Sequence, residues 1–521
     1  MQLTQRMHFY LRSIALLTIS LPVIGWAQDL RVSVEPLEID LSEQGANYAD
    51  LQLIYAKPGD NPKKPRIQTP FHLYLVGTDS RDQRARALAL YEFDKTGWQK
   101  KLATPMDSAV NLSQLIDADP APRLVTHAEG TLEVLDVEAQ SFKPLIKLPS
   151  IYRTKAVDLD ADIEFARDLT GDGLDDLLMP DFDGWRFSVA QSDGTFSKPQ
   201  LFGPQPIMNV GSARYVNFTA NTPYLLDHNL DDRLDVAFWA DDALQVYYQN
   251  EGAVFSTTPV TMEVAPNIES DAFFSLSVGT DEDNPTGRQV LLDAIEDLDG
   301  DGLPDMVVYS VTGEGLFGKE TRFEIHRGVR NEQNQLTFET TASSVVGSGG
   351  IQIAAERRDL NGDGTLEMMV TSFDLGIGSI IRGLLSRKAN LQLAIYEMQD
   401  GRYPKTPVLT RKVTAKLDIG KGDIFVPAVL AGDVNGDGIK DLLVQDGDGE
   451  LDVFVGQTGK RLFARSPITI NVDLPESDGS IKVANLDGDA DDDLLVLFDA
   501  NKAEQRQPQI HAVRFSPGEE S

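Results

Sequence analysis

The sequence contains no cysteine, and this absence restricts both its chemistry and the forces that hold its fold together. Disulfides, thiolate nucleophiles, cysteine-ligated metals and a lipid-carrying cysteine are all excluded. A folded chain of 521 residues must then be stabilised by apolar packing and, where its side chains supply ligands, by bound metal ions.

Positive charge is also scarce, because 47 lysines and arginines stand against 81 aspartates and glutamates, for a formal net charge of −34. Such a surface repels phosphates, so nucleic acids and anionic membranes are poor partners. The hydrophobic content of 41% lies in regular apolar segments. That pattern indicates a folded chain and not a disordered acidic one.

Motifs for catalysis are missing as well. The chain has neither a GxSxG nucleophile elbow nor an HExxH helix, and residues 456–460, GQTGK, lack the spacing of a phosphate-binding loop. We therefore predict no enzymatic activity, no catalytic residue and no organic cofactor. The histidines beyond residue 27 are isolated from one another in the sequence: His72, His127, His228, His326 and His511.

Long apolar runs are absent except near the start of the chain. Residues 1–27 combine the basic Arg6 and Arg12, an apolar stretch and small residues before a cut after Ala27, which is typical of a secretory signal. The stretch is short and interrupted by Pro22, which disfavours the alternative of an uncleaved membrane anchor. We therefore predict export to the periplasm or the cell exterior, with no transmembrane segment after signal removal.

What the sequence does contain is a repeated acidic loop, seen most clearly in residues 297–305, DLDGDGLPD. Carboxylates occupy positions 1, 3, 5 and 9, and glycines occupy positions 4 and 6. Hard oxygen ligands at alternate positions around a tight glycine turn are typical of a calcium loop. The same frame begins at Asp168, Asp359 and Asp433, and weaker copies begin at Asp227 and Asn485.

Positions 1, 3, 5 and 9 of these six loops are the predicted Ca2+ ligands, and the seventh residue is expected to add a backbone carbonyl. We predict about four to six sites. The predicted ligands are Asp168, Thr170, Asp172, Asp176, Asp227, Asn229, Asp231, Asp235, Asp297, Asp299, Asp301, Asp305, Asp359, Asn361, Asp363, Glu367, Asp433, Asn435, Asp437, Asp441, Asn485, Asp487, Asp489 and Asp493.

Two other interpretations of the loops are weaker. An EF-hand requires a glutamate at position 12 between two helices, whereas position 12 of the four best loops is apolar and strand-like. A metal-free aspartate turn would place several like charges together without neutralising them, and four copies in one frame argue against it. The loop at Asp297 carries four carboxylates at its predicted ligand positions, more than any other loop, and is the tightest predicted site. The apolar residues at position 12 are Met179, Val308, Val370 and Val444.

The loops also define a structural repeat of about 60 residues, each with a loop followed by three or four short strands. Four-stranded units repeated radially form a β-propeller. We predict an all-β fold with residues 28–521 as one propeller of eight blades, or seven if the N-terminal region is not a full blade. Residues 28–115 form its metal-free N-terminal region, residues 116–521 contain the repeats, and the calcium loops start at residue 168. The early strand RVSVEPLEI, residues 31–39, is expected to complete the last blade.

These loops resemble the FG-GAP/VCBS repeats that also form the propeller blades of integrin α-subunits. The resemblance covers roughly residues 115–515 and is carried by the pattern D-x-[DN]-G-D-G-x-x-D, from which the loop at Asp168 departs by Thr170 and the loop at Asp359 by Glu367. It departs further at Leu230 and Asp232 of the second loop and at Ala490 of the last. The family implies a calcium-braced propeller that serves as an extracellular binding scaffold, and some polysaccharide lyases use calcium propellers of this kind.

Three classes of function remain open. We favour a non-catalytic scaffold that binds an envelope or extracellular protein or a glycan. The alternatives are a carbohydrate-binding protein or calcium-dependent polysaccharide lyase, and a structural subunit of an envelope or adhesive assembly. A lectin would place aromatic residues at loop tips, for which Trp185 and Trp239 are candidates, although both suit packing within a blade.

One segment does not fit the strand pattern. Apolar residues between 377 and 385 recur with helical spacing, and Ser379 is placed to cap a helix over 379–388. We predict a short helical insertion there that either folds onto the propeller or contacts a partner. Its apolar residues are Ile377, Ile380, Ile381, Leu384 and Leu385.

Overall fold

The computed structural model describes most of the chain from Leu30 to Pro517. The described residues are 30–41, 48–55, 70–79, 82–94, 96–118, 122–154, 163–210, 216–269, 289–312, 320–349, 351–373, 388–418, 423–447, 449–459, 461–475, 480–498 and 508–517. They are almost entirely strands and turns, with one 3-10 turn, η1 (Ile151–Thr154). Within this described part, no helix is long and apolar enough to cross a bilayer. The predicted signal segment, residues 1–27, lies outside it.

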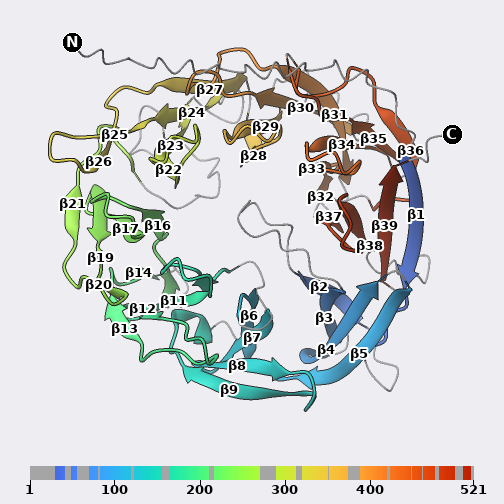
Figure 1. Cartoon of the computed structure of the whole chain (residues 1–521), viewed down its shortest axis with the longest axis horizontal. Coiled ribbons are helices and arrows are strands. Elements are labelled where there is room, and N and C mark those ends of the chain that lie inside the picture. The colour runs from blue at the N-terminus through green and yellow to red at the C-terminus, as the bar shows by residue number, and fades with distance from the viewer. Residues whose placement is uncertain are drawn as a thin grey trace, which may run out of the picture.

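Eight antiparallel sheets of four or five strands stand around a common axis in the described residues (Figure 1). The first four blades are β2 (Tyr48–Tyr55), β3 (Phe71–Asp79), β4 (Asp82–Asp94), β5 (Gly97–Met106); β6 (Val110–Ile116), β7 (Arg123–Ala128), β8 (Thr131–Asp136), β9 (Ser141–Lys147); β10 (Ala166–Arg167), β11 (Asp176–Asp181), β12 (Gly184–Ser188), β13 (Gln200–Phe202); and β16 (Tyr224–Leu226), β17 (Asp235–Ala240), β18 (Ala243–Tyr247), β21 (Val260–Met262).

The last four blades are β22 (Gln289–Glu296), β23 (Asp305–Thr312), β24 (Glu320–His326), β27 (Ser344–Gly349); β28 (Ile351–Arg358), β29 (Glu367–Phe373), β30 (Lys388–Tyr396), β31 (Leu409–Asp418), β32 (Asp423–Phe425); β33 (Val429–Gly432), β34 (Asp441–Asp446), β35 (Glu450–Phe454), β36 (Ile468–Asn471); and β37 (Ile481–Ala484), β38 (Asp493–Phe498), β39 (Gln509–Pro517), β1 (Leu30–Leu37). The all-β, eight-bladed propeller is thereby confirmed. Strands β2 to β5 form a complete blade, which decides against seven.

The ring closes through the two ends of the chain, as the sequence predicted. Strand β1 pairs antiparallel with β39, with Leu30 opposite Pro517 and Leu37 opposite Ile510. The last blade therefore takes three strands from the C-terminal end and its outermost strand from the N-terminal end. This arrangement leaves no gap between the first blade and the eighth.

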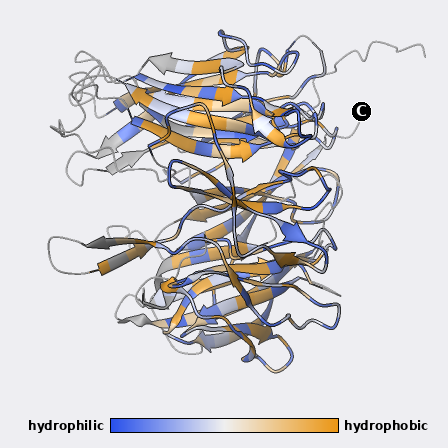
Figure 2. Cartoon of the chain, turned by 90° about the vertical axis from the view of Figure 1, so that its left-hand side faces the viewer, coloured by the Kyte–Doolittle hydropathy of each residue, from blue (hydrophilic) through white to orange (hydrophobic). Residues whose placement is uncertain are grey.

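Among the described residues the core consists of eight apolar clusters, one at each junction between neighbouring blades. The cluster between the eighth and first blades joins Leu495 and Ile510 to Phe71 and Phe93, so the closing junction is as apolar as the others. The second strand of a blade is covered on both faces, which explains why these strands are continuous apolar runs and do not alternate. In β23, Asp305–Val311 are all buried. Figure 2 shows the apolar residues concentrated along the strands.

Three short hairpins extend beyond the blades: β14 (Ile207–Val210) with β15 (Val216–Thr219), β19 (Gln249–Asn250) with β20 (Val254–Phe255), and β25 (Gly328–Arg330) with β26 (Leu336–Phe338). The hairpin β25–β26 reaches the preceding blade, where the Leu336 N–H donates to the carbonyl of His228. The predicted helix over 379–388 lies outside the described residues except for Lys388. Lys388 is the first residue of β30 and not the last residue of a helix, so the predicted end of the helix is wrong at this residue.

Candidate metal centre

All six predicted metal loops occupy the same place in their blades, the connection from the innermost strand to the second strand. Residues 168–175 join β10 to β11, and residues 485–492 join β37 to β38. The other four loops lie at the equivalent connections of the fourth to seventh blades. Because equivalent connections of a propeller lie on one side, six consecutive blades present acidic loops on the same face of the ring.

The backbone of the Asp297 loop is folded around the first carboxylate. Asp297 accepts hydrogen bonds from the N–H groups of Gly300 and Gly302, both at 2.9 Å. These glycines have φ angles of 71° and 84°, a left-handed conformation that glycine adopts without steric cost. The turn that brings the side-chain oxygens of positions 1, 3 and 5 together needs a left-handed backbone at positions 4 and 6. This explains the two glycines of the motif.

The weaker loop at Asp227 follows the same path without glycine. Leu230 and Asp232 replace the two glycines and adopt φ angles of 56° and 65°. Each left-handed non-glycine residue costs roughly 1–2 kcal/mol. Asp227 still accepts from the N–H groups of Asp231 and Asp232, so the departures from the motif change the energy of this loop and not its shape.

The ninth residue of each loop is the most deeply placed acid. In the Asp433 loop, Asp441 is fully buried, and its two oxygens accept from Val434 N–H at 3.0 Å and Gly456 N–H at 2.7 Å. Burial raises the pKa of Asp441 to about 7. This carboxylate therefore ties the start of its loop to the end of the third strand, a structural role that the sequence did not indicate. Burial likewise raises the pKa values of the other ninth residues, Asp176, Asp235, Asp305, Glu367 and Asp493, to between about 6 and about 8.

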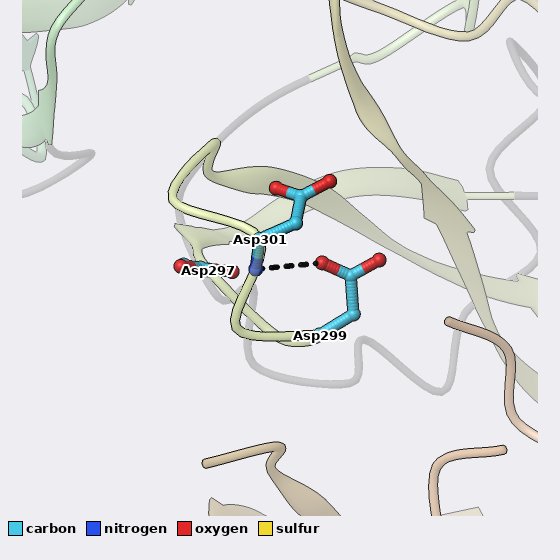
Figure 3. A group of neighbouring side chains, drawn as sticks. All are labelled: Asp297, Asp299 and Asp301. Carbon is cyan, nitrogen blue, oxygen red and sulfur yellow. Dashed lines mark hydrogen bonds between the residues drawn. The ribbon is translucent and has the colours of Figure 1, made fainter. Parts of the chain in front are cut away.

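In the part of the chain that the structure describes, two groups of three aspartates each bring their carboxylate oxygens close enough to hold one metal ion. The first is Asp297, Asp299 and Asp301, with one oxygen from each lying within 4.8 Å of the others (Figure 3). These are positions 1, 3 and 5 of the loop that the sequence marked as the most complete. All three ligand atoms are oxygens, the donor type that calcium and magnesium prefer.

An arginine that the sequence analysis missed contacts this first triad. The Arg327 guanidinium lies 2.7 Å from Asp299 and 3.1 Å from Asp301. The turn of the next blade comes equally close, because a Cβ on Gly401 would lie 2.8 Å from Asp299 Oδ2. Arg327 follows the third strand of the blade, and nothing in the loop motif points to it. The loop with the most carboxylates at its predicted ligand positions therefore also has an arginine in contact with two of them.

The second triad, in the last loop, uses a different set of positions. Asp487, Asp489 and Asp491 hold positions 3, 5 and 7, and their oxygens lie within 4.8 Å of one another. The predicted first ligand, Asn485, donates its amide N–H groups to the carbonyls of Asp489 and Asp491, and its Oδ1 accepts from Gly488 N–H. Burial and hydrogen bonding to Asp489 raise the pKa of Asp491 to about 8. Only a backbone carbonyl was expected at position 7, and nothing in the loop motif marks Asp491.

In the described part of the chain, three loops contain buried oxygen atoms that accept no hydrogen bond, and such atoms indicate whether a cation would fit the loops. Asn229 Oδ1, Glu367 Oε1 and Asp491 Oδ1 are buried and have no hydrogen-bond partner within the described residues. They belong to three different loops, at positions 3, 9 and 7. A buried acceptor without a donor costs about 1–3 kcal/mol, and more when charged. The donor set therefore fits a hard cation, which would satisfy these oxygens.

The loops differ in how their charge is balanced. Arg233 contacts Asp231 within the Asp227 loop, and Arg514 and Lys440 contact Asp487 and Asp492 in the last loop. For the carboxylates of the loops at Asp168, Asp359 and Asp433, the described residues show no ion pair of this kind at positions 1, 3 or 5. The loops thus form two groups. In one group an arginine or lysine side chain contacts the loop carboxylates, and in the other group the described residues show no such contact.

Neighbouring loops are also joined directly. The N–H of Leu366 donates to the carbonyl of Leu298 at 2.9 Å, and the N–H of Lys440 donates to the carbonyl of Leu360 at 3.1 Å. A further bond of 2.6 Å runs from Asp492 N–H to the Asp433 carbonyl. The loops of four consecutive blades therefore form one hydrogen-bonded chain.

The two tryptophans considered for a lectin pack inside the ring. Trp185 and Trp239 are 5% and 8% exposed, and the Trp185 ring lies 5.3 Å from that of Phe238. They fill junctions between blades and offer no surface to a ligand. Asp117, at the degenerate position in the second blade, accepts from Asp175 N–H and so takes part in the contact between blades.

Comparisons with known proteins find similarity only among solved structures. No family model and no curated protein matches the chain. A lectin from Agrocybe aegerita that recognises non-reducing terminal N-acetylglucosamine is 12% identical, with 84% of this chain and 97% of that chain covered and a TM-score of 0.38. The Vibrio cholerae biofilm matrix protein Bap1 is 12% identical, with 93% and 91% covered and a TM-score of 0.37. The WD40 domain of SCAP from fission yeast is 10% identical, with 84% and 97% covered and a TM-score of 0.31.

Proposed function

We propose that this chain is an exported calcium-binding β-propeller of the FG-GAP/VCBS type that acts as a non-catalytic binding or assembly scaffold. The observation that carries the proposal is the pair of aspartate triads, together with the unpartnered buried oxygens of Asn229, Glu367 and Asp491 in three of the six loops. The residues that would hold calcium most fully are Asp297, Asp299 and Asp301 in one loop and Asp487, Asp489 and Asp491 in the other. Bound calcium would neutralise like charges and connect positions that are otherwise held only by turns.

Calcium is favoured over other cations by the chemistry of the donors. The loops provide carboxylate, amide and carbonyl oxygens and no histidine or cysteine at the ligand positions. Soft and borderline metals prefer nitrogen and sulfur, whereas calcium takes six to eight oxygens in flexible geometry. The irregular ligand sets of the six loops suit calcium better than magnesium, which demands a near-ideal octahedron.

Export is supported by the position of the closing strand. A cut after Ala27 would leave β1, which begins at Leu30, complete and able to pair with β39. The signal segment and the closing strand therefore do not compete for the same residues. We place the mature protein in the periplasm or outside the cell, where an envelope or extracellular protein or a glycan is its partner.

Thermal unfolding of the mature chain tests the calcium proposal. Ligands that bind only the folded state raise its stability by mass action, so millimolar calcium should raise the melting midpoint over that in chelator. Combined Asp297→Asn and Asp301→Asn substitutions should reduce the calcium response. Asp193→Asn is the matched control, because Asp193 caps an exposed turn through Thr195 N–H outside any metal loop. Identical midpoints with chelator and with calcium would contradict the proposal.

The absence of catalysis is a separate part of the proposal and has its own test. The mature protein with calcium should not degrade a panel of neutral and uronic polysaccharides. Turnover that is lost when a carboxylate outside the metal loops is substituted would replace the scaffold by the polysaccharide lyase alternative.

A further inference from the structure

A surface pocket lies where the closing strand β1 meets the first blade. It has a volume of about 580 Å³ and is lined by the end of β1, the segment that follows it, and the β4–β5 hairpin. Its polar and aromatic lining includes Glu35, Glu38, Asp40, Tyr91, Trp98 and Lys100. None of these residues belongs to a metal loop. The volume falls within the range of pockets that bind small molecules or single units of a polymer.

We propose that this pocket binds a neutral hexose unit of an oligosaccharide, with Trp98 as the stacking surface. The inference names a ligand for the scaffold and so rests on the proposed function. A pyranose has one apolar face of C–H groups and a rim of hydroxyls. A matching site needs an aromatic ring beside groups that both accept and donate hydrogen bonds, and this pocket contains both.

Trp98 is the only tryptophan beyond residue 27 that is not deeply buried. Its ring is half-buried, packed edge-on against Phe93 with 4.8 Å between centroids, so its position is fixed. Its Nε1 is buried and has no hydrogen-bond partner within the described residues. Because this donor is buried, a ligand in the pocket would contact the exposed part of the ring and not the indole N–H.

The polar groups are held in place before any ligand binds. Asp40 is bonded to Lys100 through one oxygen, and its backbone N–H and carbonyl are both bonded to the Tyr91 hydroxyl, at 2.7 and 3.1 Å. Glu35 is bonded to Arg514, which lies behind the pocket. A carboxylate has about four acceptor sites, so each retains capacity for ligand hydroxyls. Preorganised groups lose little entropy on binding.

The charge of the pocket selects against anions. Lys100 and Arg514 offset two of the three carboxylates, and the described residues place no cation against Glu38. The remaining negative charge repels uronic acids, sulfated sugars and phosphates. Quaternary ammonium ligands are disfavoured for another reason, since they are held in cages of several aromatic rings and Tyr91 is only 2% exposed.

The pocket is open enough for a unit within a longer chain. The side chains of Asp40 and Lys100 are 54% and 38% exposed, so a sugar seated there could continue in both directions. Gly97 has no side chain that would fill part of the pocket. It has a φ of 95°, and a Cβ at this position would lie 3.1 Å from Glu35 Oε2.

Tryptophan fluorescence of the calcium-loaded mature protein tests the inference, because Trp185 and Trp239 are buried and insensitive to added sugar. The probes are cellohexaose, laminarihexaose, mannohexaose and chitohexaose, with polygalacturonate and choline chloride as charged comparisons. At least one neutral hexamer should shift the emission, with binding confirmed by calorimetry. Trp98→Ala removes the fluorescent reporter, so its binding is measured by calorimetry and should be at least tenfold weaker, and Glu38→Gln should weaken binding several-fold.

Three controls keep the result interpretable. Glu332→Gln removes an exposed acid elsewhere and should leave binding unchanged. Trp98→Phe preserves more of the packing against Phe93 and should bind with intermediate affinity, which serves if Trp98→Ala fails to fold. The melting midpoint with and without calcium is measured on the same samples, so a protein that responds to calcium and not to sugar loses only this inference.

The inference is overturned if no neutral hexamer binds, or if Trp98→Ala and Trp98→Phe bind as tightly as the unaltered protein. Binding of polygalacturonate or choline that depends on Trp98 would also overturn it, because the pocket would then serve a charged ligand.

Discussion

The first two blades and the remaining six blades are stabilised in different ways. The first blade has strands of 8, 9, 13 and 10 residues, and its connection between β2 and β3 contains no acidic repeat. In four of the six loop-bearing blades the innermost strand has only two to four residues. Long strands supply many backbone hydrogen bonds and a large apolar face, whereas short strands supply few.

This difference in strand length indicates what the acidic loops contribute to the stability of their blades. In a blade with a short innermost strand, the position of that strand depends on the loop that follows it, through the buried ninth carboxylate and the ligands of the first five positions. In the first blade the sheet itself is sufficient. In the four blades with a short innermost strand the acidic loop therefore supplies local polar bracing that the short strand does not, whereas β22 and β28, with eight residues each, combine a loop with a long strand. This suggests four ways to test the comparison.

The largest expected effect follows removal of a ninth carboxylate. Asp441→Ala leaves the N–H groups of Val434 and Gly456 buried without an acceptor. Each orphaned donor costs about 1–3 kcal/mol, so the free energy of unfolding should fall by about 2–6 kcal/mol. Denaturant unfolding in chelator measures it, because the loss does not depend on metal. Asp446→Ala, at the exposed end of the same strand, is the control. Equal effects of the two substitutions would show that Asp441 does not brace the blade.

Chelation should separate the two groups of blades directly. Amide hydrogen exchange in β10, β16 and β33 should become about tenfold faster without calcium, equivalent to about 1.4 kcal/mol. Exchange in β3 and β4 of the first blade should stay unchanged. A uniform increase across all eight blades would mean that the ring opens as one unit and that the comparison between blades is wrong.

The positive charge of Arg327 at the Asp297 loop should weaken its calcium binding. Arg327→Gln removes a positive charge next to Asp299 and Asp301, and a unit charge at about 4 Å contributes about 1 kcal/mol even in water, or about fivefold in affinity. Calorimetric titration should show one class of sites binding more tightly. Arg330→Gln, on the exposed end of β25, should leave the titration unchanged. If Arg327→Gln weakens calcium binding, the guanidinium positions the ligands and does not compete with the metal.

The smallest expected effect concerns pH in the second blade. His127 is fully buried, with its Nε2 3.0 Å from the Leu148 carbonyl, and burial lowers its pKa. Because the folded state then binds fewer protons than the unfolded state, whose histidine pKa is about 6.5, stability should fall as the pH drops below that value. Melting midpoints between pH 5 and 7.5 should therefore decline less steeply in His127→Gln than in the unaltered protein. Parallel declines would mean that this histidine is not charged on unfolding.

The periodic features of the sequence were sufficient to predict the fold. Loop spacing and the apolar run after each loop determine the blade, and the strand at residues 31–39 had no other partner of its type. The site was predicted less completely, because Arg327 and Arg514 approach from outside the loops and Asp491 occupies position 7, where only a backbone carbonyl was expected. Asn485 matches position 1 by spacing, yet its amide is engaged with its own loop. Motif spacing specifies which backbone positions converge, whereas the side chains that approach from other strands depend on tertiary packing.

The pairing of β1 with β39 also determines when the ring can be completed during synthesis. Strand β1 is synthesised early, and its partner β39 is synthesised only after almost all of the remaining chain. Until then its edge is unpaired, and Arg31, Glu35 and the edge residue Pro36 discourage pairing with other chains. A chain that stops before Gln509 would lack the strand that joins its two ends. Closure of the ring thus depends on the last strand of the chain. A truncation that removes only this strand should destabilise the fold far more than the number of residues lost would suggest.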